Sequence, residues 1–133
     1  RLMENLNYAV QEKHEVIDPR ILHVVHEAVR KENVSKTLKE SYAGAVIALP
    51  EILDDWKDDP YRPVINAIAR NSSAWVSTHD YLVTKHKTAV LRVAVAGATK
   101  NYALLNKIHQ GTKSETIRAW VERNPAFVDA SEG

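Results

Sequence analysis

Apolar residues recur at every third or fourth position along most of this chain, and this spacing restricts what it can fold into. A clear example follows Asp18-Pro19, a typical helix start with Asp as the N-cap and Pro in the first turn. The residues that then share one helix face are Ile21, Leu22, Val25, Ala28 and Val29. Strand-like alternation is almost absent, and only four glycines and five prolines punctuate the chain. We therefore expect an all-α fold.

Start and stop signals predict a compact bundle of about seven helices. An amphipathic helix is expected over residues 5–16, and other helix starts are Asn33 or Ser35, Pro50, Pro63, Ser73, and Thr99 or Asn101. Two helices are expected to be long. One runs to Leu49 with Gly44 inside it, although glycine there costs about 1 kcal/mol relative to alanine. The other runs from Trp75 to about Ala94, with a possible break near Ser77-Thr78.

The C-terminal stretch Gly111–Pro125 predicts a tight turn followed by a helix. Thr112 and Glu115 have the spacing of a capping box, and Gly111 suits the left-handed geometry that ends a preceding helix. Pro125 marks the end of the helix, because the residue before a proline avoids the α region. Its inward face consists of Ile117, Trp120 and Val121.

This stretch resembles the second half of a helix-turn-helix, as in MerR-like regulators and transposase DNA-binding domains. The shared pattern is Gly111, four variable residues, Thr116-Ile117-Arg118, one more residue and Trp120. The resemblance covers about 15 residues and implies that this helix enters the major groove of double-stranded DNA. Arg118 then reads a guanine, and lysines and arginines around it hold phosphates. The residues implied at DNA are Lys113, Ser114, Glu115, Arg118, Arg123, Lys100 and Lys107.

The charge distribution is uneven between the two halves of the chain, although the net charge is only +1. Residues 1–69 hold nine basic and twelve acidic residues, whereas residues 70–124 hold nine basic and three acidic ones. This imbalance favours a nucleic-acid contact in the C-terminal half, but it also fits an ordinary solvated surface. We expect one domain over 1–133, with a possible weaker division into an acidic half, 1–71, and a basic half, 72–133. We find no internal repeat.

No residue pattern indicates an enzyme, a cofactor or a metal site. There are no cysteines, and no nucleophile elbow or glycine-rich phosphate loop is present. His23 and His26 lie one helical turn apart, but no other ligands stand at a recognised spacing. The acidic segment 54–60 lacks the glycine and final glutamate of a calcium loop.

Two functions remain open from the sequence. The first is a small DNA-binding or regulatory protein that uses the C-terminal hairpin. The second is a helical interaction or assembly module, because Ala94, Gly97 and Ala98 form a smooth surface. That surface is either core or, if it faces outward, a groove for a protein partner or a homo-oligomer. The longest apolar run, 43–49, is too short to cross a bilayer, so we expect a soluble, cytoplasmic or otherwise intracellular protein.

Overall fold

The computed structural model describes residues 18–31 and 34–132, and this part of the chain is all-helical, as expected. It contains nine helices and no strand, and the helix expected over 5–16 lies outside it. The helices are α2 (Pro19–Val29), α3 (Lys36–Ala43), α4 (Pro50–Asp55), α5 (Arg62–Arg70), α6 (Val76–Lys85), α7 (Ala89–Ala98), α8 (Tyr102–Gln110), α9 (Glu115–Arg123) and α10 (Pro125–Glu132).

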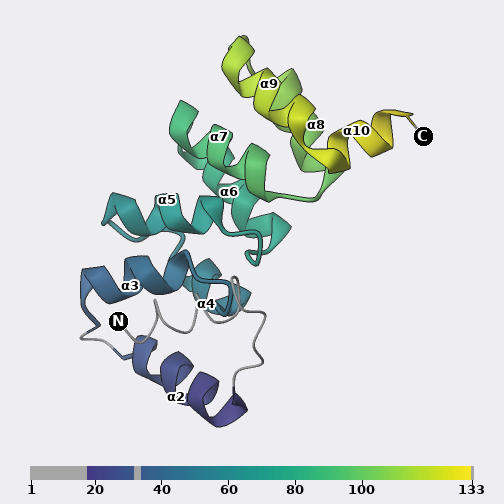
Figure 1. Ribbon diagram of the computed structural model, residues 1–133. Helices are drawn as coiled ribbons and strands as arrows, with labels where there is room; N and C mark the ends of the chain where they lie inside the picture. The colour runs from purple at the N-terminus through teal and green to yellow at the C-terminus, as the bar shows by residue number, and fades with distance from the viewer. Residues whose placement is uncertain (1–17, 32–33, 133) are drawn as a thin grey trace.

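The helices form a layered bundle that extends in one direction (Figure 1). Helices α3, α5, α7 and α9 pack side by side, in this order, as a single row. Helix α6 packs against α5 and α7, and α8 packs against α7 and α9, so they form a second layer. Helix α2 contacts α3 at one end of the row, and α10 contacts α8 and α9 at the other. Helical hairpins stacked in this way bury a continuous core between neighbours.

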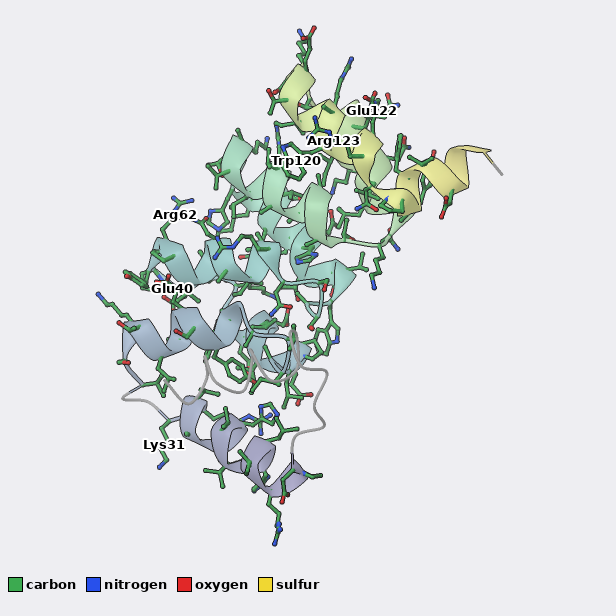
Figure 2. All side chains as sticks on the ribbon, in the orientation of Figure 1. Lys31, Glu40, Arg62, Trp120, Glu122 and Arg123 are labelled. Atoms are coloured by element: carbon green, nitrogen blue, oxygen red, sulfur yellow. The ribbon has the colours of Figure 1, made fainter. Side chains whose placement is uncertain are left out.

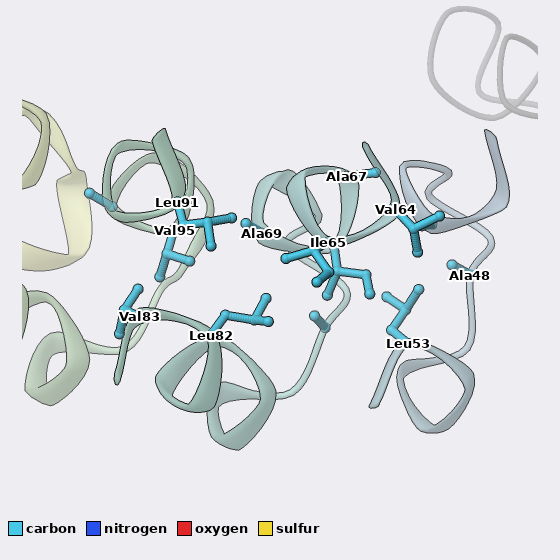
Figure 3. Packing of buried hydrophobic residues seen from close by; sticks show 14 of the residues in the cluster. Ala48, Leu53, Val64, Ile65, Ala67, Ala69, Leu82, Val83, Leu91 and Val95 are labelled. Carbon is cyan, nitrogen blue, oxygen red and sulfur yellow. The ribbon is translucent and has the colours of Figure 1, made fainter. Parts of the chain in front are cut away.

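The apolar core runs along the whole row, and Figure 3 shows part of it from close by. It begins with Val25 on α2 and continues without interruption to Val121 on α9. Its largest side chains, among them Leu53, Leu82 and Leu91, are completely buried. The amphipathic spacing in the sequence therefore corresponds to one shared core between the two layers.

Local signals in the sequence identified several helix starts correctly. The Asp18 carboxylate accepts a hydrogen bond from the backbone N–H of Arg20 at 2.9 Å, and Pro19 begins α2. Ser35 caps α3 and Asn101 caps α8, each through its side-chain oxygen. Pro50 is the first residue of α4, as Pro19 is the first residue of α2. These signals depend on neighbouring residues alone, and they are therefore readable in a single sequence.

The first predicted long helix is wrong, because α3 ends at Ala43 rather than at Leu49. Gly44 is its C-cap, and the chain then turns toward α4. A distant side chain stabilises this end, since the Asn71 amide donates to the carbonyl oxygen of Ala43 at 2.8 Å. The Tyr42 hydroxyl accepts from the backbone N–H of Leu49 at 2.9 Å, which holds the turn.

The second predicted long helix is divided, but not near Ser77-Thr78. Residues 86–88 separate α6 from α7, and the N-cap of α6 is Trp75 rather than Ser73. Thr78 is completely buried, and its hydroxyl donates to the Asp54 carboxylate at 2.8 Å. This bond to α4 keeps Thr78 inside the helix.

The predicted capping box before α9 is also wrong. The N-cap is Ser114, whose hydroxyl accepts from the backbone N–H of Ile117 at 3.4 Å. Thr112 instead accepts from the N–H of Ser114 at 3.1 Å, which closes the turn. Gly111 has a φ of −88°, outside the left-handed region, and Pro125 begins α10 as well as following α9. The Thr112 hydroxyl thus stabilises the turn, and the Ser114 hydroxyl caps the helix.

The structure contains an internal repetition that the sequence analysis did not find. Asn71 after α5 donates to the carbonyl oxygens of Ala43 and Ala45, and Asn124 after α9 donates to those of Ala96 and Thr99. The sequence Ala-Gly-Ala occurs at 43–45 and again at 96–98, 53 positions later. Asn71 and Asn124 are separated by the same 53 positions. The units α3–α5 and α7–α9 are therefore two structural repeats.

We expect Asn124→Asp to destabilise the protein more than Asn124→Ala. Alanine leaves two buried carbonyl oxygens without donors, which costs about 2–3 kcal/mol in the free energy of unfolding. Aspartate also places a carboxylate against those oxygens, so the loss is larger. Urea denaturation at pH 7 measures both values. Asn106→Asp on α8 is the control, because its side chain makes no hydrogen bond in the described structure and lies half-buried. Equal losses at 106 and 124 would contradict this role.

Two histidines make the stability of the fold sensitive to acid. The Tyr42 hydroxyl accepts from Leu49 N–H and forms a second hydrogen bond with His26 Nδ1, 2.7 Å away. His79 is buried, and its Nε2–H donates to the Ile68 carbonyl oxygen at 3.0 Å. Burial lowers the pKa of both imidazoles below the usual value of 6.5. Both rings are consequently neutral in the folded protein near neutral pH.

We therefore expect stability to be constant above about pH 6.5 and to fall as the pH drops below it. The unfolded chain then binds protons that the folded protein, with its lowered histidine pKa values, does not. Thermal unfolding from pH 7.5 to pH 5 measures this slope, which should become shallower in His26→Gln. His23→Gln on the exposed side of α2 is the comparison, and it should change the slope less, because His23 adds only a charge effect to the burial that lowers the His26 pKa. An unchanged slope in His26→Gln would show that this contact does not sense pH.

Candidate binding groove

An open apolar groove lies along α7, between α5 and α9. It has a volume of about 390 Å³, and we call it the α7 groove. Its floor is α7, one wall comes from α5, and the other wall is Trp120 on α9. The lining residues are Asn66, Arg70, Val90, Val93, Ala94, Gly97, Ala98 and Trp120.

The floor is low because of the small residues on one face of α7. Gly97 is exposed, and Ala94 and Ala98 are partly exposed, so this surface faces outward rather than into the core. A Cβ atom at Gly97 would lie 3.6 Å from the Trp120 ring, which rests against α7 at this point. Any side chain longer than alanine at position 97 would therefore collide with the ring or fill the groove.

The groove wall formed by Trp120 distinguishes the second structural repeat from the first. Trp120 on α9 is 40% exposed, whereas its counterpart 53 positions earlier, Ala67 on α5, is buried. Trp120 was predicted to face inward with Ile117 and Val121, and this was wrong. The helical spacing that indicated an inward position also fits the edge of the buried face, where the ring forms a groove wall.

Basic side chains gather where the α7 groove meets the C-terminal ends of α5 and α9. Arg70 ends α5, Arg123 ends α9, and Lys100 follows α7; we call these three residues the basic end. A second hollow of about 560 Å³ continues from the groove and is lined by Arg70, Lys100 and one acid, Asp129. The Arg123 guanidinium lies over the Trp120 ring, 5.7 Å from its centroid (Figure 2). Within the described residues, none of the three bases forms an ion pair.

Several residues predicted at DNA have partners within the protein. Lys107 Nζ donates to the Asp80 carboxylate at 2.6 Å and to the Thr84 hydroxyl at 3.0 Å, so α6 neutralises its charge. Arg118 Nε donates to the Thr112 carbonyl oxygen at 3.2 Å. The Ser114 hydroxyl is occupied as the helix cap.

The predicted DNA residues do not form one face. Arg118 and Arg123 are five positions apart, which separates them by about 140° around α9. Arg123 and Lys100 lie toward the α7 groove, whereas Lys113 and Glu115 are exposed near the start of α9. The acid Glu122 is exposed as well, and its carboxylate lies 3.2 Å from His109 Nε2. Of the predicted set, Arg123 lies over the Trp120 ring at the groove wall and Lys100 lines the adjoining second hollow.

Sequence reasoning missed Asn66, Arg70 and Val90, which belong to the groove. Asn66 and Arg70 were assigned no role, although they lie four positions apart on α5 and so share one face. Val90 falls within the long helix predicted from Trp75 to about Ala94, and it is 63% exposed. Val90 lies seven positions, or two helical turns, before Gly97, so it shares a helix face with the small residues of α7. This spacing is a signal that could have linked it to the groove.

Other kinds of site receive no support from the described part of the chain. No group of three or more histidine, aspartate or glutamate side chains within it is placed to hold a metal ion. The imidazole of His26 is engaged with Tyr42 instead. Within the same ranges, no helix has the length and apolar character needed to cross a membrane.

Comparisons with known proteins identify no relative that could assign this groove a role. No family model matches the chain, and no curated protein or solved structure matches it significantly.

Proposed function

We propose that this protein is a helical interaction module that holds a segment of another protein in the α7 groove. The observation that carries this proposal is the exposed apolar surface of the groove, where Val90 is 63% and Trp120 is 40% exposed. Apolar side chains exposed together beside a hollow mark sites of association on soluble proteins. The groove is also large enough for several side chains of a partner.

The composition of the groove supports a protein partner. Tryptophan and arginine are the residues that most often dominate binding energy at protein interfaces, and Trp120 and Arg123 lie in contact here. Trp120 is supported from below by α7 at Gly97. A ring that is already held in place loses little conformational freedom on binding. The row of packed helices beneath it provides a rigid base.

A second candidate, binding to double-stranded DNA, is favoured by one observation. Lys113, Arg70, Lys100 and Arg123 are exposed and lack carboxylate partners in the described structure. Free bases in the C-terminal half are what contact with phosphates requires. The base reader implied by the helix-turn-helix resemblance, Arg118, would have to exchange its bond to Thr112 for a bond to a base.

Val90→Glu should weaken the binding of peptides selected against the protein. A displayed library of random peptides, panned on the immobilised wild-type chain, supplies ligands whose affinities are then measured by fluorescence anisotropy. A carboxylate on the groove floor must be desolvated by an apolar ligand, so we expect at least a tenfold loss of affinity.

Val24→Glu on α2 is a matched control for this experiment, because Val24 is also 63% exposed and lines none of the hollows described here. It should leave the affinity unchanged. Equal losses from both variants, or no peptide selected at all, would contradict a binding role for the groove.

For the DNA candidate, we expect micromolar or tighter binding to a labelled duplex at low salt, falling steeply as salt is added. Lys113→Ala should weaken this binding and make its salt dependence less steep, because one phosphate contact is lost. Lys107→Ala is the control, since Asp80 already neutralises that lysine. Fluorescence anisotropy at several salt concentrations measures all three proteins. Absence of binding at low salt would remove this candidate.

A further inference from the structure

We infer that the segment bound in the α7 groove is an amphipathic helix of another protein, with acidic residues at the end that meets Arg70, Lys100 and Arg123. This inference rests on the proposed function and specifies the partner. Two independent features carry it: the backbone chemistry of the groove, and the distribution of charge along it.

The backbone of the groove favours a helical occupant. Its floor and both walls come from the helices α5, α7 and α9, whose backbone groups are bonded within each helix. The lining therefore offers no strand edge with which an extended segment could pair. An extended chain on this apolar surface would leave its own N–H and C=O groups without partners, whereas a helix satisfies them internally.

The dimensions of the groove also suit a helix. The floor follows α7 from Val90 to Ala98, which is about 12 Å, or roughly two helical turns. Its small residues, Ala94 and Gly97, allow another helix to approach closely. Trp120 on one side and Asn66 on the other would flank such a helix and restrict its direction to that of α7.

The charge is concentrated at one end. Arg70 lines both the α7 groove and the second hollow, Lys100 lines the second hollow, and Arg123 lies over the Trp120 ring. No acidic residue lines the α7 groove itself, and Asp129 is the one acid in the lining of the second hollow. Acidic side chains on the partner would complement this charge, whereas basic ones would be repelled.

A set of three synthetic peptides tests this inference directly. Each is an amphipathic helix of about four turns with leucines along one face. The three differ at one end, where they carry glutamates, glutamines or lysines. Fluorescence anisotropy at low and moderate salt should show that the glutamate peptide binds at least tenfold more tightly than the other two, and that added salt reduces this difference.

Charge reversal supplies the decisive comparison. In the double variant Arg70→Glu, Arg123→Glu, the preference should change from the glutamate to the lysine peptide. Lys113→Glu is the matched control, because it changes an exposed base near the other end of α9, and it should keep the wild-type preference. Circular dichroism confirms folding of each variant. If the double variant does not fold, Arg70→Gln and Arg123→Gln, tested singly, should each reduce the preference.

The possible outcomes separate this inference from the proposed function. Equal affinity for the three peptides, with loss of all binding in Val90→Glu, would overturn the acidic partner and leave a groove that binds apolar helices. If library peptides bind the groove but none of the helical ones does, the helical occupant is wrong. If no peptide of any kind binds, both proposals fail. Sedimentation of the chain alone as a stable dimer, sensitive to Val90→Glu, would replace the partner by a second copy.

Discussion

The C-terminal carbonyl groups of a helix have no partners within that helix, and in this protein they lie inside a row of packed helices. In each of the helices α3, α5 and α7, a carbonyl oxygen near the C-terminal end accepts a hydrogen bond from a side chain later in the chain. The amide of Asn71 reaches α3, the imidazole of His79 reaches α5 at Ile68, and the amide of Asn124 reaches α7. Without these donors, buried carbonyls would remain unsatisfied at every step of the row.

These bonds also align the helices and so place the α7 groove. Because α5 and α9 each end one residue before a buried asparagine, their last residues, Arg70 and Arg123, occupy equivalent positions. Both arginines therefore point out of the same edge of the row, where they also complement the helix dipoles. What differs between the repeats is the wall, since Trp120 replaces the small Ala67 and rises beside the floor of α7.

The parts of the fold that a single sequence revealed are those with local causes. The caps Asp18, Ser35 and Asn101 bond to backbone groups two or three residues away. Asp18 was predicted outright, and the other two were each predicted as one of two alternatives. The end of α3 was missed because its cause, Asn71, lies 28 positions from Ala43. The repeat was missed because the two units have few identical residues at equivalent positions. The main ones are Ala-Gly-Ala and the dipeptides Arg70-Asn71 and Arg123-Asn124. Most other side chains differ between the units, and the bonds made by the two asparagines are what reveal the repeat.

The same distinction explains how far the candidate site was predictable. The surplus of basic residues after residue 69 was visible by counting, but the count does not show that Asp80 neutralises Lys107 from 27 positions away. Nor does it show that Arg123 lies on an aromatic ring beside an apolar floor. Phosphates are held by exposed bases, whereas this basic end opens onto apolar side chains, whose removal from water lowers the free energy. A ligand that uses both parts must itself be apolar along most of its length and anionic at one end. A duplex, which is charged at every step, matches only the basic end.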